Sequence, residues 1–171
     1  RVLVSVGGGV LGRRLLETAA QAVALSRHPW HLLAGGPDAA EVAARLSAGA
    51  PGLTVEPARR DYRSLLAGAA ASVSLCGYNT VTDLAACDTP AVLVPFEAHG
   101  QREQRLRADR LAGLPGITLL PEAGLAPATL AAAANAAAAG PRRGPLPLSR
   151  DGAARAATAL LSLAAGAPHD A

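Results

Sequence analysis

The chain alternates between short apolar runs and segments with helical spacing. The first run, Arg1–Val6, is rich in β-branched residues and ends at three glycines, which is typical of a strand that leads into a loop. After it, apolar residues recur every three or four positions, as in an amphipathic helix. The repeated pattern predicts strands at residues 1–6, 30–34, 53–55, 71–75, 91–94 and 117–120. It predicts helices at residues 11–25, 38–48, 61–70, 80–87, 101–112, 127–138 and 151–165, with a linker at 140–147.

Strands that are apolar throughout and alternate with helices are typical of a parallel sheet covered on both faces. We therefore predict an α/β fold with a doubly wound parallel (Rossmann-like) sheet and a strand order like 3-2-1-4-5-6. One such domain spans residues 1–171, with residues 166–171 expected to form a frayed tail. Because this fold binds ligands beyond the carboxyl ends of its strands, the segments to inspect are Gly7–Gly12, Gly35–Asp38, Glu56–Tyr62, Cys76–Asp83 and Pro95–Gln104.

Composition narrows the class of protein. Half of the 171 residues are apolar and the net charge is only +3, which excludes a disordered chain. The small excess of Arg and the few aromatic residues argue against a nucleic-acid partner. No apolar run reaches the roughly 18 residues of a membrane span. Two cysteines make no disulfide framework, so we expect a cytoplasmic location.

Two further features concern the ends of the chain and its metal-binding potential. The sequence starts inside a strand pattern, without an initiator methionine or signal peptide. We therefore expect it to be a piece of a longer protein, cut at a domain boundary. No C-x-x-C, H-x-x-x-H or paired-carboxylate spacing suggests a metal site or a hydrolase, so we predict neither metal nor cofactor.

The glycine loop after the first strand permits several interpretations. Residues 7–12 read Gly-Gly-Gly-Val-Leu-Gly and match G-x-G-x-x-G between a strand and a helix, as in dinucleotide sites. That fingerprint also needs an acidic residue at the end of the second strand to hold the ribose. Here the strand ends at Ala34 and two glycines and a proline follow, so that Asp38 comes only at the start of the next helix. The alternatives are a tight turn, or a loop that lies close to a diphosphate or a partner domain.

A second glycine turn precedes the helix predicted at residues 80–87. Gly77 allows the backbone to approach a ligand, and the following helix presents free N–H groups and a positive dipole end to an anion. Asp83 follows about one turn inside this helix, where its carboxylate can accept hydrogen bonds from two vicinal hydroxyls such as those of a ribose.

The stretch from Cys76 to Gln104 resembles the nucleotide-sugar half of bacterial GT-B glycosyltransferases, which contain two Rossmann domains. It is closest to the MurG-like family, which transfers N-acetylglucosamine from UDP. The shared features are a glycine turn, Thr80-Val81 and an acidic residue, a helix of small residues, Pro90-Ala91, and a strand that ends in Val-Pro-Phe. The Tyr-Asn-Thr-Val sequence at 78–81, together with the Glu103-Gln104 pair, looks closer still to a less characterised bacterial group of predicted glycosyltransferases. The resemblance covers nearly the whole chain, as the C-terminal half of such an enzyme.

The resemblance implies a role for individual residues in donor binding. It places Gly77 and the backbone of Tyr78, Asn79 and Thr80 near the diphosphate, Asp83 at the ribose, Glu103 and Gln104 at the sugar, and Arg59 and Arg60 where the main chain reads the uracil edge. Gly8 and Gly9 of the glycine loop are also expected to bind the substrate. Three positions depart from the family pattern. Asp83 is one methylene shorter than the family's Glu, the Gly-Gly-Ser loop reads Gly-Gly-Gly, and two arginines replace apolar residues at the base.

The resemblance implies the donor-binding half of a metal-independent, inverting glycosyltransferase. The donor is a UDP-sugar, with UDP-N-acetylglucosamine as the expected sugar, and the partner is the N-terminal acceptor-binding domain of the same enzyme. The catalytic base is expected on that absent domain, so the chain alone should bind the donor without turnover. The alternatives are a non-catalytic nucleotide-binding module and an NAD-dependent oxidoreductase.

Several candidate residues also have ordinary structural interpretations. Asp83 could be a solvated helix residue, and Glu103 with Gln104 an exposed helix face. The arginines that follow on the same helix are expected on a solvated or partner-facing side. Cys76 is expected to be a small buried residue, although its place at a strand end leaves a thiol function open. His99 could donate to a phosphate or a sugar.

Overall fold

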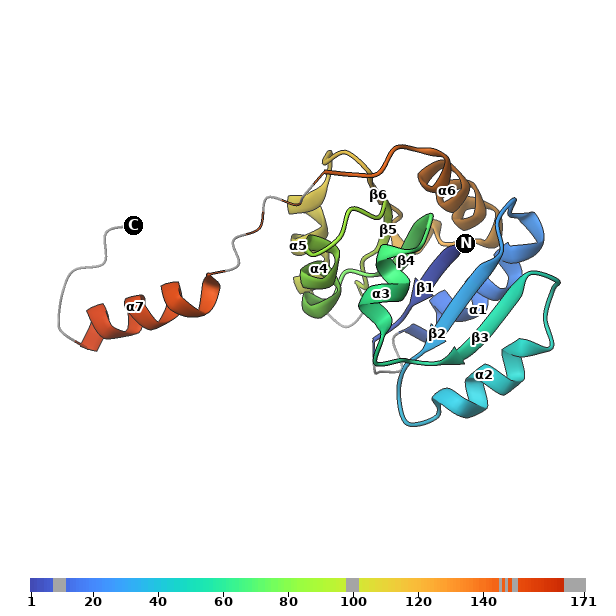
Figure 1. The fold of residues 1–171 in the computed structure, drawn as a ribbon, viewed down its shortest axis with the longest axis horizontal. Coiled ribbons are helices and arrows are strands. Elements are labelled where there is room, and N and C mark those ends of the chain that lie inside the picture. Colours follow the sequence, from blue (N-terminus) through green and yellow to red (C-terminus); the bar gives the residue numbers. More distant parts are fainter. Residues whose placement is uncertain (8–11, 98–101, 145, 147, 149–150, 165–171) are drawn as a thin grey trace.

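Six parallel strands form a single sheet in the computed structural model, which describes residues 1–7, 12–97, 102–144, 146, 148 and 151–164. The strand order is β3-β2-β1-β4-β5-β6 (Figure 1), which confirms the predicted fold class and topology. The strands are β1 (Val2–Ser5), β2 (Trp30–Ala34), β3 (Leu53–Pro57), β4 (Ala71–Leu75), β5 (Ala91–Val94) and β6 (Ile117–Leu119). Strand β1 pairs with β2 on one side and with β4 on the other. The sheet therefore grows from β1 in one direction up to β3 and in the opposite direction from β4 onwards, and the order reverses between β1 and β4. In such sheets this switch point is where ligands bind.

Helices cover both faces of the sheet. They are α1 (Arg13–Ala22), α2 (Ala39–Ser47), α3 (Tyr62–Ala67), α4 (Tyr78–Ala85), α5 (Glu103–Leu111), α6 (Pro127–Ala139) and α7 (Gly152–Ala164), with short 3₁₀ helices η2 (Val23–Leu25) and η3 (Glu122–Gly124). Alternate residues of β1 point to opposite faces: Val2 and Val4 pack with residues of α1, α2 and α6, whereas Leu3 packs with residues of α3, α4 and α5. The strands are therefore apolar throughout because both of their faces are buried.

The stretch predicted as a linker at 140–147 packs against the domain. Among its described residues, Arg143 is only 3% exposed and Leu146 is also buried. Gly116 permits this packing, because it has a φ of +74° and an added Cβ would lie 2.5 Å from Cβ of Arg143. The described residues of this stretch form no helix or strand, as expected of a linker. A Pro- and Gly-rich sequence indicates only the absence of a helix and says nothing of packing.

Helix α7 is not packed into the core, unlike the other α-helices. None of its residues is buried, and Leu160, Leu161 and Leu163 are exposed. Figure 1 shows α7 (orange-red) extending away from the sheet and its covering helices. None of the helices in the described part of the chain combines the length and apolarity that a membrane crossing requires.

Removal of residues 149–171 is therefore expected to leave the domain folded. Since α7 buries nothing, the melting temperature should change by no more than about 2 °C, the effect of a few tenths of a kcal/mol in a domain of this size. Thermal unfolding followed by circular dichroism measures this. A fall of several degrees would mean that α7 packs on the domain in solution.

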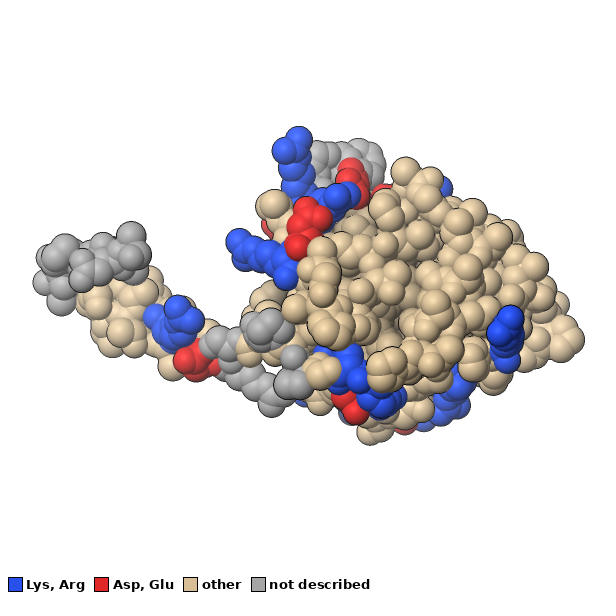
Figure 2. Space-filling view, turned by 90° about the horizontal axis from the view of Figure 1, so that it is seen from above, with Lys and Arg blue, Asp and Glu red and all other residues tan. Residues whose placement is uncertain are grey.

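Basic and acidic side chains are intermixed on the surface. Figure 2 shows arginines beside carboxylates on the visible face, with large uncharged areas between them. Ion pairs account for part of this pattern: Arg105 of α5 contacts Asp109 at 2.8 Å and Glu97 at 3.1 Å. The charge is therefore distributed in local clusters on this face.

Candidate functional site

A pocket of about 240 Å³ lies at the carboxyl ends of the strands, at the switch point of the sheet. It lies where β1 and β2 end and where α3 and α4 begin. Its lining residues are Ser5, Val6, Gly7, Leu33, Ala58, Arg59, Tyr62, Asn79, Thr80 and Asp83. Four segments that are separated in the sequence therefore meet in one cavity, as the doubly wound topology requires.

The N-terminus of α4 forms one side of this pocket. The helix begins at Tyr78, two residues before the predicted start at Thr80, because Gly77 adopts an extended N-cap conformation with φ −69° and ψ 160°. The first helical hydrogen bond joins the Val81 amide to the Gly77 carbonyl at 3.1 Å. The N–H groups of residues 78–80 thus precede that bond, and no side chain of the described residues caps this helix. Such groups, at the positive end of the helix dipole, form an anion-binding terminus.

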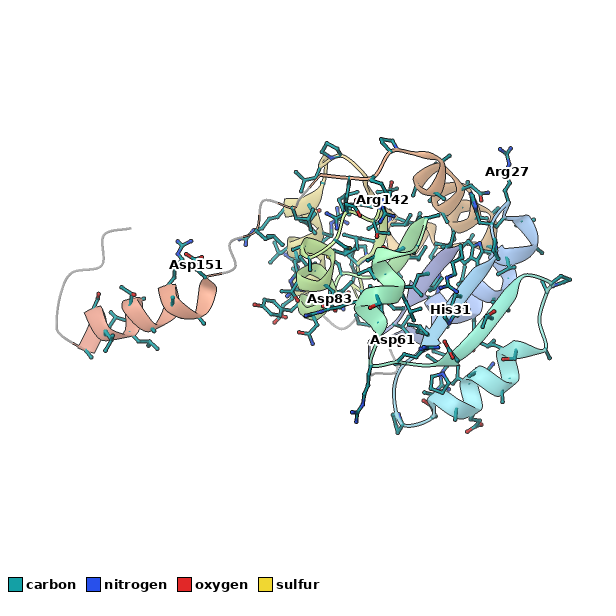
Figure 3. All side chains as sticks on the ribbon, viewed as in Figure 1. Arg27, His31, Asp61, Asp83, Arg142 and Asp151 are labelled. Atoms are coloured by element: carbon teal, nitrogen blue, oxygen red, sulfur yellow. The ribbon has the colours of Figure 1, made fainter. Side chains whose placement is uncertain are left out.

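Asp83 lines the pocket from the second turn of α4. The earlier helix start moves it deeper into the helix than the first-turn position that was predicted. Its carboxylate is only 16% exposed and accepts a hydrogen bond at 2.7 Å from Nε of Arg63, which is 75% exposed. Figure 3 shows Asp83 on α4 and Asp61 at the start of α3, at the same end of the sheet. Arg63 therefore occupies one carboxylate oxygen of Asp83 and neutralises part of its charge.

Arg59 approaches the pocket from the loop after β3 and is held by two carboxylates. It contacts Asp61 through Nε at 2.8 Å and Nη2 at 2.7 Å, and Glu56 through Nη1 at 3.2 Å. These carboxylates, Asp61 first, raise the pKa of Arg59, so the guanidinium stays charged. Arg60 is exposed and is not among the residues that line the pocket.

The carboxylate of Glu56 connects Arg59 to the buried His31 of β2. Nε2 of His31 lies 2.6 Å from Oε1 of Glu56. Partial burial disfavours the ionised form of Glu56, but hydrogen bonds from His31 and Arg59 outweigh this effect and lower its pKa. Glu56 therefore remains a carboxylate that anchors the guanidinium of Arg59 at the rim of the pocket.

Tyr62 and Ser5 are pocket residues that sequence reasoning missed. Their hydroxyl oxygens are 3.0 Å apart, which joins the first turn of α3 to the end of β1. Burial raises the pKa of the Tyr62 phenol, so it keeps its proton at neutral pH. Only their positions in the chain could have identified them. Ser5 lies near the carboxyl end of the first predicted strand, and Tyr62 lies in the segment that follows the third, where this fold binds ligands.

The remaining predicted site residues lie outside the lining of this pocket. Gly77 and Tyr78 precede the pocket-lining residues of α4, and the Tyr78 side chain is exposed. Glu103 is 88% exposed at the start of α5. The side-chain carbonyl oxygen of Gln104, one residue later, accepts hydrogen bonds from two backbone amides. Their predicted roles at the diphosphate and the sugar stay predictions. Gly8, Gly9 and His99 lie outside the described residues.

Neither a reactive thiol at Cys76 nor a metal site is found among the described residues. Cys76 is fully buried, and burial raises the pKa of its thiol to about 11, so it is a neutral thiol at physiological pH and unsuited to nucleophilic chemistry. Within the described ranges, no three His, Cys, Asp or Glu side chains gather in a way that could hold a metal ion.

The fold and the pocket define the class of this protein: a doubly wound α/β domain with a pocket at its topological switch point, where this fold binds ligands. Residues 3–159 match the glycosyltransferase family 28 C-terminal domain, and the chain belongs to this family. No curated protein sequence gives a significant match to the chain.

The solved structures with similar folds include glycosyltransferases. The calicheamicin glycosyltransferase CalG4 matches 81% of this chain with 28% identity and a TM-score of 0.63, and 34% of its own length is covered. MurG of Acinetobacter baumannii matches 77% with 24% identity and a TM-score of 0.63, with 41% of its length covered. LpCGTa, solved in complex with UDP, matches 96% with 20% identity and a TM-score of 0.57, with 37% of its length covered. The last two similarities concern the fold alone, and this chain spans less than half of each neighbour.

Proposed function

We propose that this chain is the donor-binding domain of a glycosyltransferase that uses a UDP-sugar and transfers the sugar by inverting displacement. The observation that carries the proposal is the convergence of Arg59, Asn79, Thr80 and Asp83 on one pocket beside the N-terminus of α4. Membership of the glycosyltransferase family 28 C-terminal domain supports the choice of donor.

The pocket suits the nucleoside part of such a donor. Its volume of about 240 Å³ is below the roughly 300–1,000 Å³ of pockets that bury a whole drug-sized ligand. We assign the base to the side lined by Leu33, Ala58 and Tyr62, with Arg59 at its edge. The ribose hydroxyls then donate to Asp83 of α4. The diphosphate continues towards the free N–H groups of α4, and the sugar lies beyond it, towards Glu103 and Gln104.

This arrangement would favour departure of the nucleotide. In an inverting transfer, an acceptor oxygen forms a bond to the anomeric carbon while the bond between that carbon and the diphosphate breaks, and the acceptor proton passes to a general base. Negative charge then develops on the diphosphate, and the helix N-terminus stabilises it electrostatically. We place the base on an N-terminal acceptor-binding domain of the same enzyme, for which the exposed leucines of α7 offer an apolar contact surface.

The nucleotide preference of the pocket provides the direct test. The 171-residue chain, titrated by calorimetry, is expected to bind UDP and UDP-N-acetylglucosamine, and to bind NAD at least about tenfold more weakly. The reason is that β2 does not end in the acidic residue that an NAD ribose needs: Ala34 is followed by two glycines and a proline, and the next acidic residue along the chain is Asp38.

Two outcomes would contradict this proposal. Binding of NAD without UDP would favour the oxidoreductase alternative, and binding of neither would leave the pocket without its assigned ligand.

Incubation with UDP-N-acetylglucosamine should release no UDP, because the chain lacks the proposed acceptor domain. A comparison with UDP-glucose under the same conditions measures the preference for the sugar.

A further inference from the structure

The backbone just before the N-terminus of α4 is held by side chains of α5. Oε1 of Gln104 accepts hydrogen bonds from the amide of Cys76 at 3.1 Å and from the amide of Phe96 at 3.1 Å. Both partners are N–H donors, so the atom between them must be the carbonyl oxygen, which determines the orientation of the Gln104 amide. One side chain therefore connects the residues that follow β4 and β5.

Arg107, one helical turn after Gln104, completes this contact. Its Nη1 donates to the Cys76 carbonyl at 2.7 Å. Residues three apart lie on the same helix face, so two neighbouring α5 side chains satisfy both backbone polar groups of Cys76. The arginines of α5 were predicted on a solvated or partner-facing side, but the side chain of Arg107 is only 25% exposed and contacts the backbone at the end of β4.

These contacts matter because of where Cys76 lies. It follows Leu75, the last paired residue of β4, and directly precedes Gly77, the N-cap of α4. Cys76 is completely buried and Phe96 is 9% exposed, so water has little access to replace a lost partner. Buried backbone groups without a partner are costly. The position of the α4 N-terminus thus depends on α5 as well as on the sheet.

We propose that Gln104 and Arg107 are positioning residues for the diphosphate site, in that they hold the backbone from which the N–H groups of α4 project. This inference rests on the proposed donor-binding function and adds a role that a contact to the sugar does not provide. A residue that only contacts the sugar affects the affinity for UDP-sugars but not that for UDP. A residue that positions the phosphate-binding helix affects both.

The test compares three variants of the 171-residue chain by calorimetry with UDP. Gln104→Leu removes the acceptor at similar size, and Arg107→Gln replaces the long, charged donor to the Cys76 carbonyl with a shorter, neutral amide. Arg110→Gln makes the same charge change at an exposed position of the same helix and serves as the control. We expect the Kd for UDP to rise about five- to tenfold in the first two variants, the effect of one or two lost hydrogen bonds, and less than about twofold in the control.

Amide hydrogen exchange supplies a readout that needs no ligand. In Gln104→Leu, the amides of Cys76 and Phe96 are expected to exchange about five- to tenfold faster. In Gln104→Glu, a carboxylate oxygen can accept both bonds, so their protection should be restored. Failure of Glu to restore it would count against the hydrogen bonds as the cause.

The outcomes separate the two proposals. Unchanged UDP affinity in Gln104→Leu and Arg107→Gln, with weaker binding of the UDP-sugar alone, would overturn the positioning role and leave Gln104 as a sugar contact. Failure of the parent chain to bind UDP would overturn the proposed function and this inference with it. The exchange rates, measured without ligand, distinguish that case from failure of the α5 contacts alone.

Discussion

Asp83→Ala is expected to weaken UDP binding about tenfold to a hundredfold, because the carboxylate would accept charge-assisted hydrogen bonds from the ribose hydroxyls, worth roughly 1.5–3 kcal/mol. Asp83 is in position for this role, since it lines the pocket and is largely buried at its rim. Asp83→Asn keeps the shape but loses the charge, so its affinity should fall between those of the parent and Asp83→Ala. Calorimetric titration with UDP measures each Kd.

The ion pair between Asp83 and Arg63 predicts how the substitution affects stability. Arg63 is 75% exposed, and exposed ion pairs contribute little to stability, so the melting temperature of Asp83→Ala should hardly change. Asp109→Ala removes an exposed carboxylate from α5, outside the pocket lining, and controls for the change in net charge. If Asp83→Ala bound UDP as tightly as the parent chain does, Asp83 could not be the ribose contact.

Arg143→Leu is expected to destabilise the domain by about 3–5 kcal/mol, the usual cost of leaving buried polar groups without their charged partner. Arg143 donates from Nε to the Thr89 carbonyl at 2.8 Å, and from Nη2 to the carbonyls of Cys87 at 2.8 Å and Leu84. These carbonyls lie at and just beyond the C-terminal end of α4, where a cation is also favoured by the helix dipole. Burial lowers the pKa of Arg143, although the guanidinium stays protonated.

Urea denaturation of the variant measures this loss, and the melting temperature should fall by about 6–20 °C. Arg143→Lys should be intermediate, because an ammonium group cannot reproduce the fork of the guanidinium. Arg27→Leu changes an arginine that is exposed (Figure 3) and should shift the stability by less than about 0.5 kcal/mol. A loss below about 1 kcal/mol in Arg143→Leu would mean that the three carbonyls find other partners.

The fold was predictable because its signals are local and repeat along the chain. Each apolar run and each helical spacing was recognised from neighbouring residues, and the strict alternation of the two implied parallel strands and their order. The boundaries were less certain: α4 starts at Tyr78 instead of Thr80 because the extended conformation of Gly77 already allows the helix to begin there. The spacing of apolar residues does not show at which residue a helix begins, because the first residues of a helix and those just before it can fit the same spacing.

Part of the candidate site was predictable for the same reason. The rule that ligands bind at the carboxyl ends of parallel strands selected the segments that contain Arg59, Asn79, Thr80 and Asp83, and the structure brings these four residues to one pocket. Tyr62 and Ser5 lie in or beside the same segments but carry no motif, so only their contact at 3.0 Å identified them as a pair. The roles of the pocket residues in donor binding remain the proposal to be tested.

The sequence by itself determined the α/β class, the strand order and the edge of the sheet at which a ligand can bind, because these follow from periodicity and chain order. Only the tertiary structure decided which polar side chains serve the backbone. Nothing in the local sequence distinguishes Arg107 and Arg143 from exposed arginines, yet one donates to the carbonyl of Cys76 and the other to the carbonyls of Leu84, Cys87 and Thr89. Their partners lie 31 to 59 residues away in the chain. A buried carbonyl accepts a hydrogen bond from whichever donor the packing brings within reach, and local sequence does not encode that distance.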